Sequence, residues 1–385
     1  MKIQLLNKIA PVGTDLFDKS WKVGEDVTEA DAIMVRSASM HEMTFDKNLK
    51  AIARAGAGVN NIPLDECAKQ GIIVFNTPGA NANGVKELTL AALLLASRKI
   101  VDGVNWTKTL GDNPLGVAKS VEKGKSSFAG CELRGKTLGV IGLGAIGGLV
   151  ANAATRLGMK VVGCDPFISV NAAWRLDAHV VKANTFDDVY AVSDYITLHV
   201  PATDDTKGMI NAETLAKMKD GVKIVNLARA DLVNAADVKA SIASGKVSCY
   251  VTDFPTEDTI NCDGIITIPH LGASTEESED NCAVMAANEL IEYLTEGNIT
   301  NSVNYPSVSM PKSGDVRVTV MHKNVPAMLS AISACVSGAN LNIANMINKS
   351  KGEYAYTIID VDGTVSDETV GSIKSIDGVI RVSLY

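Results

Sequence analysis

The sequence lacks a hydrophobic run long enough to span a membrane. The longest strongly apolar stretch, Leu88 to Ala96, is far shorter than the ~20 residues that a spanning helix needs. The first residues, Met1 to Ile9, also lack the apolar segment of a secretory signal peptide. These absences argue against a membrane or secreted protein, and we expect a cytoplasmic location.

Basic tracts and paired cysteines are missing as well. The formal charge is −8, from 36 basic and 44 acidic residues without a basic cluster, which argues against nucleic acid or a membrane surface as a partner. The seven cysteines form no Cys-x-x-Cys pair and have no histidines at zinc spacing, so we expect reduced thiols and no metal site. The 385 residues, 46% of them hydrophobic, suffice for two or three folded domains.

A glycine-rich turn, Gly142-Leu143-Gly144-Ala145-Ile146-Gly147, follows a run that predicts a buried strand, Leu138 to Ile141, and precedes an alanine-rich segment that predicts a helix. In this setting Gly142 permits the tight turn and Gly144 lets the backbone approach a pyrophosphate. Gly147 lets the helix pack closely on the strand. The motif therefore predicts a dinucleotide site.

An acidic residue stands where such sites select their cofactor. The next predicted strand, Lys160 to Cys164, ends at Asp165. An acid there accepts hydrogen bonds from the ribose hydroxyls and repels the 2′-phosphate of NADP, so NAD is the expected cofactor. A glycine motif alone is often a turn without a ligand, but the strand, the helix and the acid together make that alternative the weaker one.

Short apolar runs alternate with helical patterns along most of the chain. This rhythm predicts an α/β protein, with a Rossmann-like doubly wound parallel sheet around the glycine motif and a flavodoxin-like unit before it. Residues 315–385 predict strand, helix, strand, strand, helix, strand, which is the ferredoxin-like order.

Three segments carry predictions of their own within this alternation of strands and helices. Asp46 to Ile52 predicts a helix, and Val85 to Val104 predicts one continuous helix. Trp106 to Phe128, with its glycines and Pro114, predicts a long irregular connection.

Polar residues follow several predicted strands, at the end where parallel sheets bind ligands. Arg36 and Arg54 carry guanidinium groups that suit a phosphate or carboxylate. Oxidation of an alcohol needs a base for the hydroxyl proton, a cation near the developing carbonyl, and an acid that orients the base. His270, Arg229 and Glu257 fit these roles in turn. Taken singly, Arg229 is equally well a surface ion pair, Glu257 a solvated charge and His270 a hydrogen-bonded loop residue. The three together favour catalysis.

Four segments resemble the D-isomer-specific 2-hydroxyacid dehydrogenases: the glycine motif, Asn226-Leu227-Ala228-Arg229, Phe254-Pro255-Thr256-Glu257 and Pro269 to Thr275. With Arg54-Ala55-Gly56 and the tail, nearly the whole chain is similar to members that oxidise 3-phospho-D-glycerate and carry a C-terminal ACT domain. The resemblance implies a discontinuous substrate domain and three domains in all, which span residues 1–97 with 275–308 (substrate), 98–274 (NAD) and 315–385 (regulation).

The resemblance also implies roles for individual residues. The catalytic set is Arg229, Glu257 and His270. The substrate-binding set is Arg36, Ser37, Arg54 and Asn81. The cofactor-binding set is Gly142, Gly144, Ala145, Ile146, Gly147, Asp165, Val200, Ala228, Thr252, Asp253, Gly272 and Ala273. The set for an L-serine effector, bound between paired ACT domains of a homodimer or homotetramer, is His322, Asn324 and Asn342.

Some positions depart from the family pattern. Thr252 stands where an aspartate usually contacts the nicotinamide carboxamide, and Asp253 follows it, so either residue is a candidate for that contact. In the tail, Ala327 replaces a usual glycine. The substrate expected first is 3-phospho-D-glycerate, oxidised to 3-phosphohydroxypyruvate for serine synthesis. The alternatives are another D-2-hydroxy acid (lactate, glyoxylate or 2-hydroxyglutarate) or a non-catalytic NAD-sensing interaction module.

Overall fold

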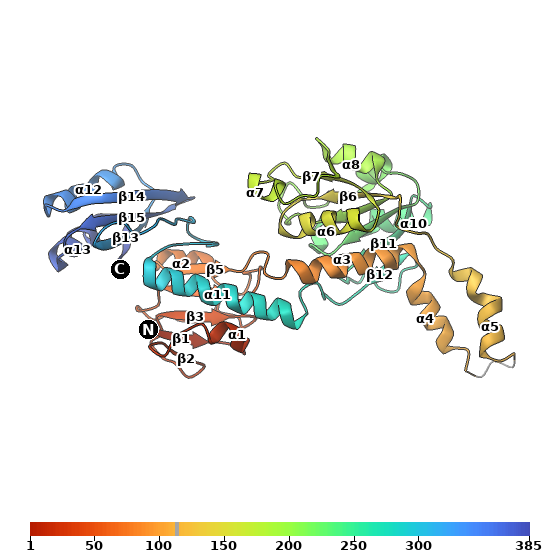
Figure 1. Ribbon diagram of the computed structural model, residues 1–385, viewed down its shortest axis with the longest axis horizontal. Helices are drawn as coiled ribbons and strands as arrows, with labels where there is room; N and C mark the ends of the chain where they lie inside the picture. The colour runs from red at the N-terminus through yellow and green to blue at the C-terminus, as the bar shows by residue number, and fades with distance from the viewer. Residues whose placement is uncertain (112–114) are drawn as a thin grey trace. The chain divides into compact units, whose positions relative to one another are not determined.

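The computed structural model describes residues 1–111 and 115–385, so Pro114 lies outside the described residues. The chain divides into two compact units, Met1–Ala80 with Glu276–Tyr385, and Asn81–Thr275. Figure 1 shows their elements. These units differ from the predicted domains because residues 81–97 belong to the second unit and the tail belongs to the first. Within the described ranges, no helix is long and apolar enough to cross a membrane.

The N-terminal sheet of the first unit is parallel, with strand order β2-β1-β3-β4-β5, which is the flavodoxin-like order. Its strands are β1 (Lys2–Leu5), β2 (Lys22–Gly24), β3 (Ala32–Val35), β4 (Ala51–Arg54) and β5 (Ile73–Asn76). The helices before residue 80 are α1 (Pro11–Thr14) and α2 (Leu64–Lys69). Helix α11 (Glu276–Glu296) returns late in the chain, and its Leu290 and Tyr293 join the core of this sheet.

The helix predicted over Asp46 to Ile52 is wrong. The segment enters β4 at Ala51, and the first three residues of that strand are buried. A short apolar run buried on both faces has no alternation by which its sequence distinguishes a strand from a helix.

The second unit holds a seven-stranded parallel sheet with the order β12-β11-β10-β9-β6-β7-β8. Its strands are β6 (Thr137–Ile141), β7 (Lys160–Cys164), β8 (Val180–Lys182), β9 (Tyr195–Leu198), β10 (Val222–Asn226), β11 (Val247–Thr252) and β12 (Ile265–Thr267). The helices between them are α6 (Ala145–Arg156), α7 (Val170–Ala173), α8 (Phe186–Val192), α9 (Ala212–Lys217), η2 (Ala230–Leu232) and α10 (Ala235–Ala243). The strand order reverses between β6 and β9, the place where doubly wound sheets bind nucleotides.

The continuous helix predicted over Val85 to Val104 is also wrong, because α3 (Ala82–Ser97) ends before α4 (Ile100–Lys108) begins. Arg98 has extended backbone angles, with φ −129° and ψ 133°. The Ser97 carbonyl accepts a hydrogen bond from the Cys131 amide at 3.0 Å. The chain that returns at Cys131 therefore takes a carbonyl at the end of α3, and the helix stops there.

The connection predicted as irregular is largely helical where the structure describes it. It forms α5 (Val117–Gly124) and a 3-10 turn, η1 (Lys125–Phe128). The ring of Trp106 packs on that of Phe128 at 5.0 Å. A Cβ on Gly124 would lie 2.4 Å from the Trp106 ring, so this glycine makes room for the helix packing and does not mark a loop.

The tail is a four-stranded antiparallel sheet with the order β14-β15-β13-β16, which is the ferredoxin-like order. Its elements are β13 (Val316–Lys323), α12 (Met328–Gly338), β14 (Asn342–Lys351), β15 (Tyr354–Asp362), α13 (Asp367–Lys374) and β16 (Val379–Leu384). The three sheets confirm the predicted fold class.

Candidate active site

The glycine turn is closed on the protein side and open on the other. Gly142 follows β6 with φ 87°, and a Cβ there would lie 2.6 Å from the His199 carbonyl oxygen. A Cβ on Gly147 would lie 1.9 Å from the Gly142 oxygen. Around Gly144, no described atom beyond its neighbours in the chain lies within 4 Å of the Cβ position. Ala145 and Ile146 begin α6 at this open face, so the turn fits a pyrophosphate that approaches the backbone.

Asp165, the first residue after β7, is fixed against this turn. Its Oδ2 accepts a hydrogen bond from the Leu143 amide and its Oδ1 from the Phe167 amide, both at 2.9 Å. Each carboxylate oxygen can accept a second hydrogen bond. The carboxylate therefore has a fixed orientation and retains acceptor capacity for ribose hydroxyls.

The two candidates for the nicotinamide contact have different surroundings. Thr252, the last residue of β11, accepts a hydrogen bond from the Phe254 amide at 3.1 Å. Asp253 is 1% exposed, and its Oδ2 accepts from the Gly272 amide at 3.3 Å. Its Oδ1 is buried and has no partner among the described residues. This unsatisfied oxygen fits the amide donors of a nicotinamide carboxamide, so the geometry favours Asp253.

Arg229 and His270 act electrostatically on the Asp253 carboxylate. Burial raises the pKa of Asp253, while the Gly272 amide, His270 and Arg229 act in the opposite direction. The Arg229 carbonyl accepts a hydrogen bond from the Asn226 side chain at 2.8 Å. The Nη1 of Arg229 donates a hydrogen bond to the Ala228 carbonyl at 2.7 Å. Of the two, His270 also contacts Asp253 directly, through a hydrogen bond from its amide to the Asp253 carbonyl at 2.9 Å.

His270 has a left-handed backbone, with φ 38°, that is stabilised by hydrogen bonds from its amide to the carbonyls of Asp253 at 2.9 Å and Ile268 at 3.1 Å. Its exposed ring packs on that of Phe254, with 4.8 Å between centroids. Glu257 is exposed in the loop after β11. Within residues 1–111 and 115–385, no hydrogen bond joins Glu257 to the His270 ring, so the predicted orienting contact is not formed.

Two arginines come together in the first unit. Arg36 follows β3, and its Nη2 forms an ion pair with Glu279 of α11. Arg54 ends β4, and its Nε donates to the Arg36 carbonyl at 3.1 Å. The amides of Arg36 and Ser37 both donate to Oδ1 of Asn7 at 3.0 Å. The predicted anion-binding residues Arg36, Ser37 and Arg54 are thus adjacent.

The remaining predicted residues lie in the second unit. Asn81 precedes α3 as its N-terminal flanking residue. Val200 contacts the glycine turn, since a Cβ on Gly142 would lie 2.9 Å from its side chain. Ala228 donates its amide to the Asn226 side chain at 3.1 Å, and Ala273 follows Gly272.

Our sequence interpretation missed three polar residues beside these sites: Asn7, His199 and Glu279. Asn7 and His199 follow strands, so the rule that selected Arg36 would also have found them. His199 lies beneath the glycine turn, and its Nε2 is 3.0 Å from Oγ1 of Thr197. Burial lowers the pKa of His199 to about 4, so its imidazole is neutral at pH 7. Glu279 gives no such signal, because it lies inside a helix distant in sequence.

One chain does not bring the three predicted effector residues together. His322 is buried, with Nε2 2.8 Å from Oγ1 of Thr357 and Nδ1 2.9 Å from the Lys323 carbonyl. The Asn324 side chain donates a hydrogen bond to the Gly352 carbonyl at 3.3 Å, near the start of β15. The Asn342 side chain donates a hydrogen bond to the Asp362 carboxylate at 2.7 Å, at the other end of β15. A strand of this length separates its two ends by roughly 25 Å.

Comparison with known proteins identifies the family. Residues 90–272 match the model of the D-isomer specific 2-hydroxyacid dehydrogenase NAD binding domain, which confirms NAD as the predicted cofactor. D-3-phosphoglycerate dehydrogenase of Escherichia coli K12 is 32% identical over 378 residues, covering 94% of this chain and 88% of the relative. The enzyme of Archaeoglobus fulgidus is 37% identical over 296 residues, and these cover 74% of this chain and 53% of that longer relative.

The structural comparison agrees. NAD+-bound 3-phosphoglycerate dehydrogenase of Entamoeba histolytica superposes with a TM-score of 0.60 at 27% identity, covering 79% of this chain and 98% of that one. D-2-hydroxyisocaproate dehydrogenase, at 20% identity and a TM-score of 0.63, shares the fold. The chain therefore belongs to the D-isomer specific 2-hydroxyacid dehydrogenase family.

Proposed function

We propose that the protein oxidises 3-phospho-D-glycerate to 3-phosphohydroxypyruvate with NAD, the first step of L-serine synthesis. The observation that carries the substrate is the adjacency of Arg36, Ser37 and Arg54, where two guanidinium groups and a hydroxyl suit a phosphate. The phosphate would compete with Glu279 for Arg36. Lactate or glyoxylate, each a monoanion, needs less positive charge. The relatives named D-3-phosphoglycerate dehydrogenase support the same substrate.

In this proposal the chain's own residues bind the substrate and move its proton. His270 accepts the hydroxyl proton of the substrate, and Arg229 binds the carboxylate and stabilises the developing carbonyl. Glu257 supports the imidazolium once substrate is bound. The glycine turn, Asp165 and Asp253 hold NAD, which accepts the hydride when bound.

A substrate panel tests this function. NADH formation is measured with 3-phospho-D-glycerate, D-lactate and D-2-hydroxyglutarate, and NADH consumption with glyoxylate. We expect the phosphorylated acid to have the highest kcat/KM, and Arg36→Gln to raise its KM with little change in kcat, because that contact is shared by ground and transition states. A higher kcat/KM for an unphosphorylated acid contradicts the substrate. NAD binding without turnover of any acid favours the non-catalytic alternative.

We further propose a homodimer or homotetramer that binds L-serine between tails. Among the strands of the described residues, β14 pairs only with β15, so it is an edge strand. If two β14 strands paired antiparallel, Asn342 of one chain would approach Asn324 and His322 of the other, which a single chain cannot achieve. Amide side chains suit serine because they both donate and accept hydrogen bonds.

Exposed apolar side chains on another part of the chain also support oligomer formation. Helices α4 and α5 extend away from the sheet of their own unit (Figure 1), and they expose Val101, Val104 and Val117 at 39%, 49% and 53%. Val101 and Val104 are three residues apart on α4 and therefore share one face of that helix, and an exposed apolar face is typical of protein interfaces.

Serine titration of the intact chain tests the effector site. We expect inhibition that Asn324→Ala and Asn342→Ala both abolish while basal kcat is unchanged. The matched control in β14 is Asn345→Ala, because the Asn345 side chain accepts from the amide of its neighbour Met346. Absence of inhibition at millimolar serine contradicts the effector proposal and leaves the catalytic proposal intact.

A further inference from the structure

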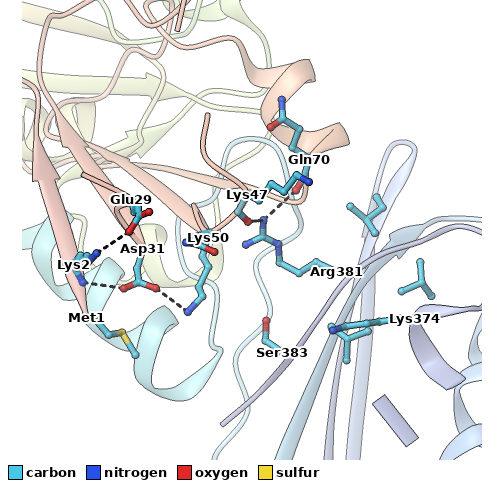
Figure 2. A pocket seen from close by; sticks show the side chains of 14 residues that line it. Met1, Lys2, Glu29, Asp31, Lys47, Lys50, Gln70, Lys374, Arg381 and Ser383 are labelled. Atoms are coloured by element: carbon cyan, nitrogen blue, oxygen red, sulfur yellow. Dashed lines mark hydrogen bonds and ion pairs between the residues drawn. The ribbon is translucent and has the colours of Figure 1, made fainter. Parts of the chain in front are cut away.

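A charged cleft of about 820 Å³ lies within the first unit, between the N-terminal sheet and the tail. Figure 2 shows Lys47 and Gln70 on one side and Lys374, Arg381 and Ser383 on the other. Lys2 is the first residue of β1, so the cleft lies at the amino ends of the strands. Arg36 and Arg54 lie at the carboxyl ends of the same strands. The cleft is therefore distinct from the proposed substrate site.

Cations outnumber acids in the lining of the cleft. Its two acids each have a lysine partner, since Glu29 pairs with Lys2 at 3.3 Å and Asp31 pairs with Lys50 at 3.1 Å. The Lys2 amide also donates to Asp31 at 2.9 Å. The acids in the lining are thus already neutralised by neighbouring lysines.

Three cations remain, namely Lys47, Lys374 and Arg381. Among the residues with described positions, none of the three forms an ion pair with a carboxylate. In a chain of net charge −8, a cleft with three uncompensated cations concentrates anions.

Close packing fixes the position of Arg381. Its Nη2 donates to the carbonyl oxygens of Gln70 at 3.3 Å and Lys47 at 3.5 Å. Gly71, with φ 67°, allows the approach, because a Cβ there would lie 3.2 Å from the Arg381 Cβ. Carbonyl oxygens do not neutralise a guanidinium, so Arg381 is placed between the two walls with its charge uncompensated.

We propose that this cleft binds a small polyvalent anion, a phosphorylated or polycarboxylate metabolite, through Lys47, Lys374 and Arg381. One charge does not suffice for three cations, and an anion with several charges contacts both walls at once. Binding therefore links the tail to the sheet that carries Arg36 and Arg54.

Calorimetric titration of the full chain tests this site with two probes, pyrophosphate and citrate, which distinguish phosphate from carboxylate chemistry. Saturating NAD occupies the glycine turn, and sodium chloride matches the ionic strength. We expect the double variant Lys47→Gln/Lys374→Gln to raise the dissociation constant of at least one probe about tenfold, as for loss of charge-assisted hydrogen bonds. The matched control is Lys182→Gln/Lys239→Gln, which removes the same charge from the second unit and should bind like the wild type.

Hydrogen exchange locates the bound probe. We expect slower amide exchange in residues 44–50 and 377–383 in the wild type, and no such slowing in the double variant. Failure of both probes to bind, an equal loss in the control variant, or protection confined to other segments each overturns the proposal. None of these results depends on which 2-hydroxy acid the enzyme oxidises.

Discussion

Two regions of the molecule differ in whether their polar groups have hydrogen-bond partners. At the junction of the tail with α11, Arg317 is fully buried and uses all five of its N–H groups. It pairs with Asp360 through bonds of 2.7 and 2.9 Å, and it donates to Glu296, Asn298 and Met310. At the carboxyl edge of the seven-stranded sheet, the His270 ring and Glu257 are exposed, and the buried Oδ1 of Asp253 has no described partner.

This difference distinguishes a structural site from a ligand-binding site. A buried polar group without a partner costs about 1–3 kcal/mol, so a purely structural site satisfies each of its groups, as at Arg317. Although burial raises the pKa of Asp360, the hydrogen bonds from Arg317 and Ser313 hold it below its usual range. Unsatisfied groups that cluster at a strand edge indicate a ligand that completes them.

The largest expected effect is a loss of stability on removing Arg317, whose hydrogen bonds are all formed. Arg317→Met leaves Asp360 buried and unpaired, and we expect the opening free energy of β13 and β15 to fall by about 3–5 kcal/mol. Amide hydrogen exchange of the full chain measures it. Arg317→Met combined with Asp360→Leu should recover most of the loss, because the two apolar side chains can pack together. Equal destabilisation by the single and double variants would contradict this account of the pair.

At the carboxyl edge of the seven-stranded sheet, a single substitution should lower the reaction rate and leave the stability of the fold unchanged. His270→Gln removes the proposed base, so kcat should fall at least about 10²-fold while the affinity for NAD and the melting temperature are retained. His179→Gln, which changes an exposed histidine of the same unit, is the control and should keep full activity. Turnover by His270→Gln within twofold of the wild type would reject the assignment.

Glu289 on α11 sharpens the comparison, because it is buried in the first unit and one of its two carboxylate oxygens lacks a partner among the described residues. Its Oε1 accepts from Asn301 at 2.7 Å, but its buried Oε2 has no partner in the described part of the chain. Burial raises the pKa of Glu289 from 4.5 to about 8. The folded protein therefore binds a proton that the unfolded chain releases above pH 4.5, and this carboxyl makes the fold less stable as the pH rises from about 4.5 to 8.

We expect the free energy of unfolding of the wild type to fall by about 2 kcal/mol, relative to Glu289→Gln, between pH 6 and pH 8. Denaturant unfolding of both proteins at the two pH values measures the difference. Parallel pH profiles would show that Glu289 titrates normally and that its second oxygen meets water.

The smallest effect concerns backbone strain. His270 and Ala327 both have positive φ, 38° and 64°, but only His270 belongs to the proposed active site. Ala327→Gly relieves a left-handed conformation that costs an alanine roughly 1 kcal/mol, so the melting temperature should rise slightly and kcat should not change. A lower melting temperature would indicate that chain entropy outweighs the strain.

The sequence predicted regular elements well where local signals agreed. Strand β7, Lys160–Cys164, has the predicted bounds, and β6 ends at Ile141 as predicted but begins one residue earlier, at Thr137. The break after Ser97 could not be predicted, because it depends on the Cys131 amide more than 30 residues later. Gly124 gave a loop signal, but its role is to admit Trp106, which only tertiary packing reveals.

The same limit applies to the candidate sites. Residues at strand ends were predictable, because one rule of parallel sheets places Arg36, Asp165, Arg229 and His270 at ligand-binding edges. The choice between Thr252 and Asp253 depends on which oxygen lacks a partner, and adjacent letters do not contain that information. The separation of Asn342 from the other effector residues follows from strand register, which the sequence leaves open.

The late return of α11 orders the events of synthesis on the ribosome. The first sheet needs Ala286, Leu290 and Tyr293 to complete its core, and these residues emerge only after the whole of Asn81–Thr275. At 5–20 residues per second, that delay is roughly 10–40 s. The dinucleotide unit, continuous in sequence, can fold during this time, while the nascent first sheet exposes an apolar face. During this interval the exposed apolar face makes the nascent chain prone to aggregation.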